Sequence, residues 1–392
     1  MAAIMGLLPM LLLLGNTLAE ETDESEETPE SRSEWGREYG DYNFAGELFN
    51  RVGDILADDQ DFVVSPLGVS QALGLLLFAV GPQSAVEIDG VLYPKTENAT
   101  GLAPRHLLQS GELTYATVAA LRPDIYIDPG FLKEAAELDS YVYRTHFGQR
   151  DIKPFNAFLK HKTQGKINVG LEKSLGDYNP ANRLLFFNVL DFKAQFRYGF
   201  HIEKRVLVAR RTLAWHGFIP ELRTRVVALG LKESSADLLI LLPMRKASIY
   251  MVERKLRTVD VRKLRSRLNI TLMNISLPKV DISQLLNLRE PLRKAGMTTV
   301  FNKTTADLSA FKTELPLDDV IAFTKINIFS QGINAGSENT TNSEQSAQLE
   351  ADSFRASVQE EKPLQFEALR PFIYAVLDSR HVYLMGRHFP TL

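Results

Sequence analysis

The chain contains no cysteine among its 392 residues. This absence excludes a disulfide framework, a thiolate nucleophile and a cysteine-based zinc site. The sequence also lacks an apolar run of roughly 20 residues, the length that a helix needs to cross a bilayer, so we expect no membrane partner. The formal net charge is only −3, which points to neither nucleic acid nor an acidic substrate. With 45 % hydrophobic and 24 % charged residues, the chain is neither wholly disordered nor fibrous.

Motifs for catalysis, metal binding and nucleotide binding are also missing. The seven histidines are scattered and none belongs to a His-Glu-x-x-His motif, so we expect no metal site and no cofactor. The nearest approach to a nucleophile elbow, at 68–72, lacks the final glycine and falls in an expected helix. Tryptophan and tyrosine form no array beside basic residues, so nucleic-acid binding has no support. The sequence therefore predicts a protein that is not an enzyme.

The first 40 residues differ in composition from the rest of the chain. An apolar run at 4–14 is followed by small residues at Thr17 and Ala19, which predicts a secretory signal peptide over 1–19. The alternative is a buried or uncleaved anchor helix. Residues 20–34 carry eight acidic groups and one arginine, so 20–40 is predicted to be a disordered acidic tail. We therefore expect a secreted, extracellular protein with a globular body over 41–392.

Secretion gives meaning to Asn-x-Ser/Thr triplets, because these are acceptor sites for N-linked glycans. Each triplet is a candidate surface position. The candidates are Asn98, Asn269, Asn274, Asn302 and Asn339.

Hydrophobic periodicity and turn signals predict an α+β fold. The expected helices are 44–56, 67–80, 132–143 and 155–162. The expected strands are 117–127, 184–192, 225–231, 237–242, 270–277 and 320–329, with a final hairpin of 372–377 and 381–385. Helices dominate the first half and strands the second, which differs from regular βαβ alternation.

Two segments stand apart from this pattern. Residues 330–362 are rich in Ser, Asn, Gln, Glu and Ala and lie between two expected strands. A connection of this length is usually functional or disordered, and it is open to proteases. Residues 245–267 hold nine Lys or Arg against two acidic residues. This segment is either a solvated helix face or a site for sulfated polysaccharide, with Arg262, Lys263, Arg265 and Arg267 as the candidate contacts.

Seven segments of the body resemble the serpin family in both order and spacing. They are 62–67 (FVVSPL), 187–193 (FNVLDFK), 237–243 (DLLILLP), 275–279 (ISLPK), 289–301 (REPLRKAGMTTVF), 366–376 (FEALRPFIYAV) and 387–390 (RHFP). The resemblance implies three sheets, about nine helices and an exposed reactive loop at about 330–362. In inhibitory members a serine protease cuts this loop. The loop then inserts into the largest sheet as a new strand while the protease remains acylated. We expect a monomer.

The hinge of the loop departs from the pattern E-E-G-T-E-A-A-A-A-T that the family uses. Aligned on Gly332, the residues that insertion would bury are Ile333, Ala335 and Ser337, followed by Asn339. Ile333 is bulkier than the family's threonine, and a glycan on Asn339 would prevent its burial. The sequence therefore favours a serpin with impaired or lost inhibition.

The alternative is a functional inhibitor of a trypsin-like extracellular serine protease. Arg355-Ala356 is then the candidate scissile bond, because Arg355 is the only basic residue in the loop before Lys362. Counting along the loop from either end gives other positions, near 346–347 and near 357–360, so the bond itself stays open. Arg355 is otherwise a solvated loop residue.

Overall fold

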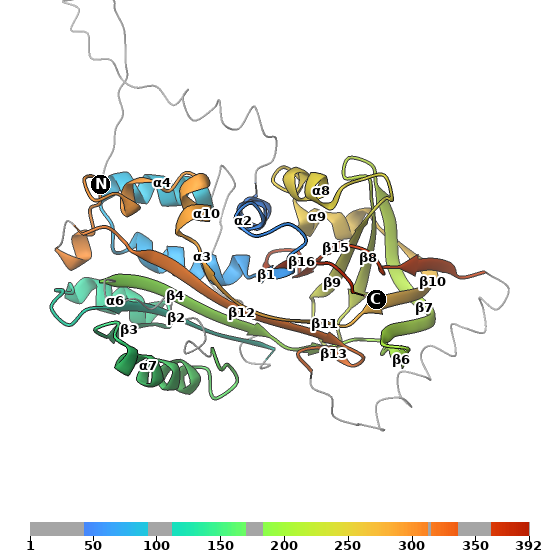
Figure 1. Cartoon of the computed structure of the whole chain (residues 1–392), viewed down its shortest axis with the longest axis horizontal. Coiled ribbons are helices and arrows are strands. Elements are labelled where there is room, and N and C mark those ends of the chain that lie inside the picture. Colours follow the sequence, from blue (N-terminus) through green and yellow to red (C-terminus); the bar gives the residue numbers. More distant parts are fainter. Residues whose placement is uncertain (1–42, 93–111, 170–182, 313–314, 336–361, 392) are drawn as a thin grey trace, which may run out of the picture. The chain divides into compact units, whose positions relative to one another are not determined.

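The computed structural model describes residues 43–92, 112–169, 183–312, 315–335 and 362–391 (Figure 1). These residues form eight α-helices, three short 3-10 helices and two β-sheets. The α-helices are α2 (Phe44–Gly53), α3 (Pro66–Leu77), α4 (Pro82–Leu92), α6 (Pro129–Glu137), α7 (Gln149–Lys162), α8 (Ile249–Lys255), α9 (Val261–Leu264) and α10 (Arg289–Lys294). The 3-10 helices are η2 (Arg265–Arg267), η3 (Thr299–Phe301) and η4 (Ser309–Phe311).

The first sheet has a parallel pair of long strands at its centre. Its order is β3 (Ser140–Arg144), β2 (Leu113–Leu121), β4 (Leu184–Phe192), β12 (Asp319–Phe329), β13 (Gly332–Ile333) and β5 (Ala194–Gln195), and β11 (Val280–Asn287) pairs with the other edge of β12. Strands β4 and β12 run parallel, with 185–191 opposite 319–325. This central pair is the point at which the sheet would have to open to admit another strand.

The second sheet is joined through one long strand. Its order is β1 (Phe62–Val64), β16 (Val382–His388), β15 (Phe372–Leu377), β9 (Asp237–Pro243), β8 (Thr224–Gly230), β7 (Val206–Ile219), β10 (Asn269–Pro278) and β14 (Leu364–Glu367), with β6 (His201–Glu203) beside β7. Residues 206–216 of β7 pair with β10, whereas 215–219 pair with β8. Strand β7 therefore connects two groups of strands, which is why the three sheets implied by the resemblance form two continuous ones.

The central strand β4 is buried on both faces. Phe186 belongs to the core cluster that includes α3, while its neighbour Phe187 lies in the cluster formed with α7. The rings of Phe187 and Phe155 of α7 are 4.9 Å apart. Figure 1 shows α3 and α7 on opposite sides of this sheet. Because helices cover both faces, successive side chains of β4 are nearly all apolar, as the prediction for 184–192 required.

The α+β prediction is confirmed, and one of its elements is wrong. The sequence predicts a single helix over 132–143, but α6 ends at Glu137 and β3 begins at Ser140. Asp139, between them, has a left-handed φ of 49°, which ends the helix. The β-prone sequence Tyr-Val-Tyr of β3 then pairs in parallel with β2.

Candidate functional site

The hinge of the loop begins as a short strand at one end of the first sheet. After β12 ends, Ser330 and Gln331 form a turn, and β13 runs back antiparallel to β12, with Ile333 opposite Ile328. The other edge of β13 pairs with β5, where Ile333 lies opposite Ala194. The first two hinge residues, Gly332 and Ile333, therefore already lie between two strands of the sheet.

Gly332 is required by the close approach of β5. A Cβ atom at this position would lie 2.1 Å from the Ala194 carbonyl oxygen and 2.7 Å from the Gln195 Cα. Its φ of 155° also lies in the range that other residues rarely adopt. Both the space and the backbone conformation therefore demand glycine.

Ile333 is fully buried, with 0 % of its surface exposed. It belongs to an apolar cluster that includes Phe196, Phe200, Ile326 and Ile328. An aliphatic side chain gains roughly 1.5–3 kcal/mol on complete burial. The size of Ile333, which the sequence suggested as an obstacle, is accommodated at this position. Ala335, two residues later, is half-buried.

Asn334 is the residue that ends β13. Its φ is +48°, a left-handed conformation that asparagine tolerates better than most residues. Its backbone N–H donates to the Asn327 carbonyl oxygen at 2.8 Å, and its Oδ1 accepts from the Asn327 N–H at 2.7 Å. Its Nδ2 donates to Asp191 Oδ1 at 2.7 Å, to the Phe192 carbonyl at 3.0 Å and to the Lys325 carbonyl at 3.2 Å.

These contacts lie where the central strands separate. The β4–β12 pairing ends with Asp191 opposite Lys325, and the Asn334 amide binds the carbonyl of Phe192 in β4 and that of Lys325 in β12. We call Asn334 and its partners Asp191, Phe192, Lys325 and Asn327 the hinge clasp. Any extension of β13 between β4 and β12 must break these hydrogen bonds and return Asn334 to an extended backbone.

The carboxylate of the hinge clasp has a raised pKa. Burial raises the pKa of Asp191 to about 6, although the positive charges of Lys325, Lys166 and Lys193 act in the opposite direction. The charged form is therefore disfavoured in the folded protein, and the hydrogen bond from Asn334 stabilises it.

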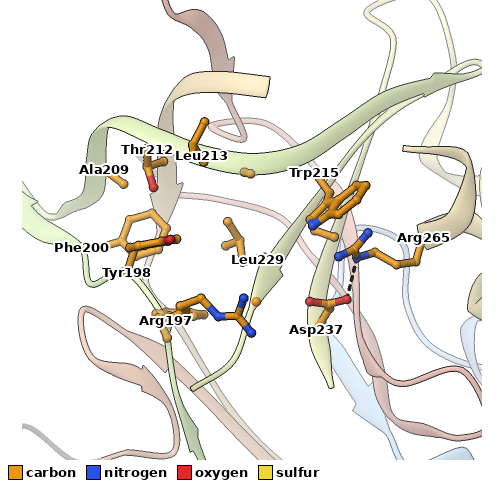
Figure 2. Close-up of a pocket in the computed structure, with 14 residues that line it drawn as sticks. Arg197, Tyr198, Phe200, Ala209, Thr212, Leu213, Trp215, Leu229, Asp237 and Arg265 are labelled. Atoms are coloured by element: carbon orange, nitrogen blue, oxygen red, sulfur yellow. Dashed lines mark hydrogen bonds and ion pairs between the residues drawn. The ribbon is translucent and has the colours of Figure 1, made fainter. Parts of the chain in front are cut away.

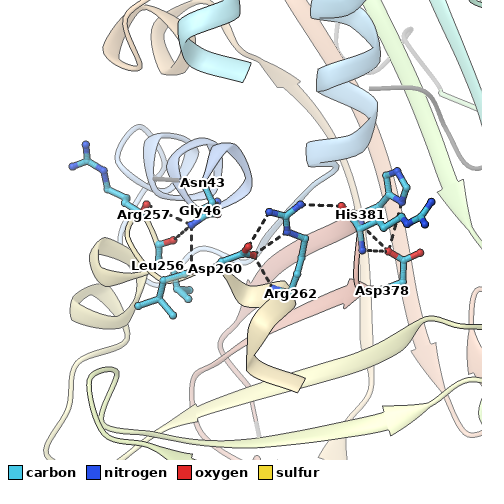
Figure 3. Close-up of polar contacts among 10 residues, drawn as sticks. Asn43, Gly46, Leu256, Arg257, Asp260, Arg262, Asp378 and His381 are labelled. Carbon is cyan, nitrogen blue, oxygen red and sulfur yellow. Dashed lines mark hydrogen bonds and ion pairs between the residues drawn. The ribbon is translucent and has the colours of Figure 1, made fainter. Parts of the chain in front are cut away.

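The basic segment is largely occupied by internal ion pairs. Arg262 binds Asp260 at 2.8 Å and donates to the Arg380 carbonyl at 3.0 Å (Figure 3). Arg265 binds Asp237 at 2.7 Å, and Arg267 pairs with Glu221. Lys263 is exposed.

Figure 3 also shows how this region attaches to α2: Asn43 donates to the Leu256 carbonyl at 2.9 Å. In the β15–β16 turn that Arg262 contacts, Asp378 accepts from the His381 N–H at 2.6 Å. Arg262, Arg265 and Arg267 thus have their charge compensated, and polysaccharide binding stays a prediction.

The described glycosylation candidates differ in accessibility. Asn269, at the start of β10, and Asn302, just after η3, are exposed. Asn274 is half-buried within β10, and its Oδ1 accepts from the Arg211 N–H at 2.9 Å. Asn98, Ser337, Asn339, Arg355 and Ala356 lie outside the described residues, as do the predicted signal peptide and acidic tail.

Two further sequence expectations concern membranes and metals. Among the described residues, no helix has both the length and the apolar character needed to span a bilayer. In the same part of the chain, no group of three or more His, Asp or Glu side chains is arranged to hold a metal ion.

Comparison with known proteins places this geometry in a family. A family model for serpins (serine protease inhibitors) matches residues 40–390, and the chain therefore belongs to the serpin family. It is 23 % identical to human serpin B8 over 327 residues, which cover 74 % of this chain and 85 % of that protein. Serpins are mostly protease inhibitors rather than enzymes.

Two solved structures show the same fold. Serpin48 of the insect Tenebrio molitor has a TM-score of 0.70 at 20 % identity, covering 95 % of this chain and all of that one. Human thyroxine-binding globulin, in a complex with thyroxine, has a TM-score of 0.70 at 19 % identity, covering 88 % and 96 %. The family thus includes both protease inhibitors and a protein named for the ligand it binds.

Proposed function

We propose that this protein is a secreted serpin in which insertion of the cut loop, and with it the trapping of proteases, is impaired or lost. The observation that carries the proposal is the hinge clasp, in which the side-chain amide of Asn334 binds both β4 and β12 at the point where they separate. On this account extracellular proteases cut the loop without being trapped.

The hinge clasp is expected to slow the insertion of the cut loop, without preventing insertion at equilibrium. Trapping requires insertion to finish before the acyl bond to the protease is hydrolysed. A hydrogen bond contributes about 0.5–1.5 kcal/mol net, or about 1.5–3 kcal/mol when one partner is charged. A barrier raised by about 3 kcal/mol slows insertion by roughly two orders of magnitude. Hydrolysis then frees the protease before the sheet has opened.

A second obstacle lies a few residues further along the sequence. Asn339 belongs to an Asn-x-Thr triplet and falls in the series that insertion would bury. A glycan is too large and too polar to enter a sheet whose faces are covered by helices. A glycan at this position would stop insertion even in a chain without the clasp.

The second candidate function is a working inhibitor of a trypsin-like protease cut at Arg355-Ala356. The complete burial of Ile333 favours it, because the first step of insertion has then already occurred. The two functions differ in whether the chain beyond Asn334 can enter the sheet.

The experiment is to cut the loop with trypsin and compare thermal unfolding before and after the cut. A loop that inserts adds a central strand and raises the unfolding temperature, whereas a clasped loop leaves it nearly unchanged. We expect no rise, and a large rise would contradict the proposal. Secretion is tested separately by expressing the full chain in mammalian cells and sequencing the N-terminus of the protein in the medium. We expect that N-terminus to be Glu20.

A further inference from the structure

We propose that a cavity next to the hinge binds a small aromatic ligand that carries one negative charge. The cavity lies between the segment 196–200 and strands β7 and β8, and Asp237 and Arg265 line one end of it (Figure 2). This proposal does not rest on the proposed function, because none of the lining residues belongs to the hinge clasp.

Aromatic side chains form two sides of the cavity. Phe196, Tyr198 and Phe200 come from one segment, and the rings of Phe196 and Phe200 pack edge to face at 5.2 Å. In Figure 2, Trp215 lies on the opposite side, with Leu229 between the two groups. Aromatic walls of this kind favour a planar ring, which packs against them by offset or edge-to-face contact.

The Trp215 side chain is positioned by a neighbouring arginine. The Arg265 guanidinium lies 3.7 Å from the centre of the Trp215 ring, and it is bound in turn to Asp237 at 2.7 Å. A cation over an indole face is attracted to the electron-rich ring. Trp215 is therefore already positioned in the free protein, so a ligand would bind without reorganising this side of the cavity.

The segment that carries the other aromatic wall is fixed at both ends. The Phe196 and Phe200 N–H groups donate to the Gln331 and Ser330 carbonyls, at 2.9 and 3.0 Å. Between them the Arg197 N–H donates to the Gly230 carbonyl in β8 at 2.9 Å. Both walls are thus attached to the sheets, and the cavity between them has a volume of about 90 Å³.

The charges that line the cavity sum to +1. Arg265 is neutralised by Asp237, whereas Arg197 makes no ion pair with any carboxylate in the described part of the chain. A Cβ atom on Gly230 would lie 3.6 Å from Arg197 Nε, so the guanidinium lies against a strand that has no side chain there. Figure 2 shows this guanidinium between Leu229 and Asp237, facing the space between the two walls.

This arrangement fits a carboxylate or sulfate group on an aromatic ring. An arginine side chain binds either group through paired N–H donors, with geometry that a lysine ammonium does not reproduce. The shared chemistry is therefore an aryl monoanion. The cavity volume of about 90 Å³ is below the roughly 150 Å³ of a closed cavity that holds benzene, so the probes carry a single ring, part of which stays outside the cavity.

The experiment uses Trp215 itself as the reporter. The chain has two tryptophans, so in the full-length variant Trp35→Phe all tryptophan emission comes from Trp215. Titration with phenylacetate and with phenyl sulfate is expected to change this emission saturably for at least one of them. Phenylacetamide, the uncharged counterpart of phenylacetate, is expected to bind at least ten-fold more weakly than the better anion.

Variants at Arg197 distinguish binding at this cavity from non-specific binding of aromatic compounds. Arg197→Gln is expected to lose at least ten-fold in affinity for the anion and none for phenylacetamide, and Arg197→Lys to recover only part of the loss. Arg210→Gln is the matched control, because Arg210 is an arginine of β7 that does not line the cavity; it should bind as the parent does. All variants are first checked for the parent's thermal unfolding temperature.

Three outcomes would overturn the proposal. They are an emission of Trp215 that neither anion changes saturably, equal affinity for the better anion and phenylacetamide, and unchanged anion affinity in Arg197→Gln. Because the readout is ligand binding by the uncut protein, none of them bears on whether the loop inserts.

Discussion

The Asn334 amide nitrogen lies 2.7 Å from the Asp191 carboxylate, although the two residues are separated by 143 positions in the sequence. Asp191 is opposite Lys325 in the last pair of the parallel ladder between β4 and β12. One side chain of the hinge therefore holds the end of the sheet at which a new strand would enter.

Removing the side chain of Asn334 should release the hinge. In Asn334→Ala the uncut protein is expected to lose about 1–3 kcal/mol of unfolding free energy, because Asp191 and two carbonyls lose a donor. After the loop is cut, the same variant, produced like the parent in bacteria and so without a glycan on Asn339, is expected to gain thermal stability that the parent does not gain. Asn302→Ala, at an exposed asparagine, is the control for both measurements. If cutting the loop changes the unfolding temperature by the same amount in the parent and in Asn334→Ala, the hinge clasp does not restrain insertion.

The buried carboxylate of Asp191 makes stability depend on pH. Its pKa is about 6 in the folded protein against 3.8 in its ordinary state. Between these values the folded state binds more protons than the unfolded state, so the contribution of Asp191 to stability falls as pH rises and is constant above about pH 7. Asp191→Asn keeps an acceptor for Asn334 but does not titrate.

The measurement is denaturant unfolding of both proteins at pH 5 and pH 8. From pH 5 to pH 8 the parent is expected to lose about 1.4 kcal/mol more than Asp191→Asn does. Comparing the two proteins removes the effect of other groups, such as Asp319, whose pKa burial raises to about 7. Identical pH dependence in the two proteins would show that Asp191 does not titrate in this range.

A methyl group at Gly332 should displace the hinge strand. Gly332→Ala places a Cβ 2.1 Å from the Ala194 carbonyl oxygen, so β13 must move away from β5. The expected loss of stability is about 1–3 kcal/mol, with faster hydrogen exchange at Ile333 and Asn334. In Gly74→Ala, by contrast, the added Cβ meets nothing within 4 Å, and this helical position should gain roughly 0.5–1 kcal/mol. Equal effects at the two glycines would contradict the close approach.

The buried ion pair between Arg387 and Glu253 holds the end of β16 to α8. Their side chains are 1 % and 4 % exposed and lie 3.1 Å apart, and Arg387 also donates to the Gln60 and Ala57 carbonyls. Arg387→Ala leaves Glu253 buried without its partner and is expected to lower the unfolding free energy by about 3–5 kcal/mol.

The control is Arg210→Ala, which removes the exposed pair with Glu203 and should change stability by less than about 1 kcal/mol. Denaturant unfolding checks both variants. A loss below about 1 kcal/mol in Arg387→Ala would mean that water or another group compensates Glu253.

Local sequence patterns predicted those elements whose conformation depends mainly on adjacent residues. The apolar run at 184–192 and the turn at 378–380 depend only on neighbouring residues, so both were recovered. Strands β7 and β11 were not predicted, because charged residues such as Arg210 and Asp281 interrupt their apolar pattern. In both strands the pairing with neighbours, rather than the local sequence, determines the conformation.

The sequence predicted Gly332 as the start of the hinge, which stays a prediction, and it did not predict the contacts that hold this segment. Gly332 was found by alignment with the family's pattern, and the close contact with β5 explains why glycine is needed there. Asn334 received no role, because it falls on the outward phase of the alternation and its partners lie in distant strands. Its only local signal is that asparagine tolerates a positive φ. The ion pairs of the basic segment were missed for the same reason. Arg265 pairs with Asp237 and Arg267 with Glu221, and both acidic residues lie outside the segment 245–267.

The most direct test of impaired trapping is to incubate the full-length protein with trypsin-like serine proteases and separate the products on a denaturing gel. Mass spectrometry of the loop locates the cut. We predict cleavage, after Arg355 in the case of trypsin, with no band at the summed mass of protein and protease. A band at that mass that resists SDS would establish a covalent inhibitor and contradict a hinge that cannot insert.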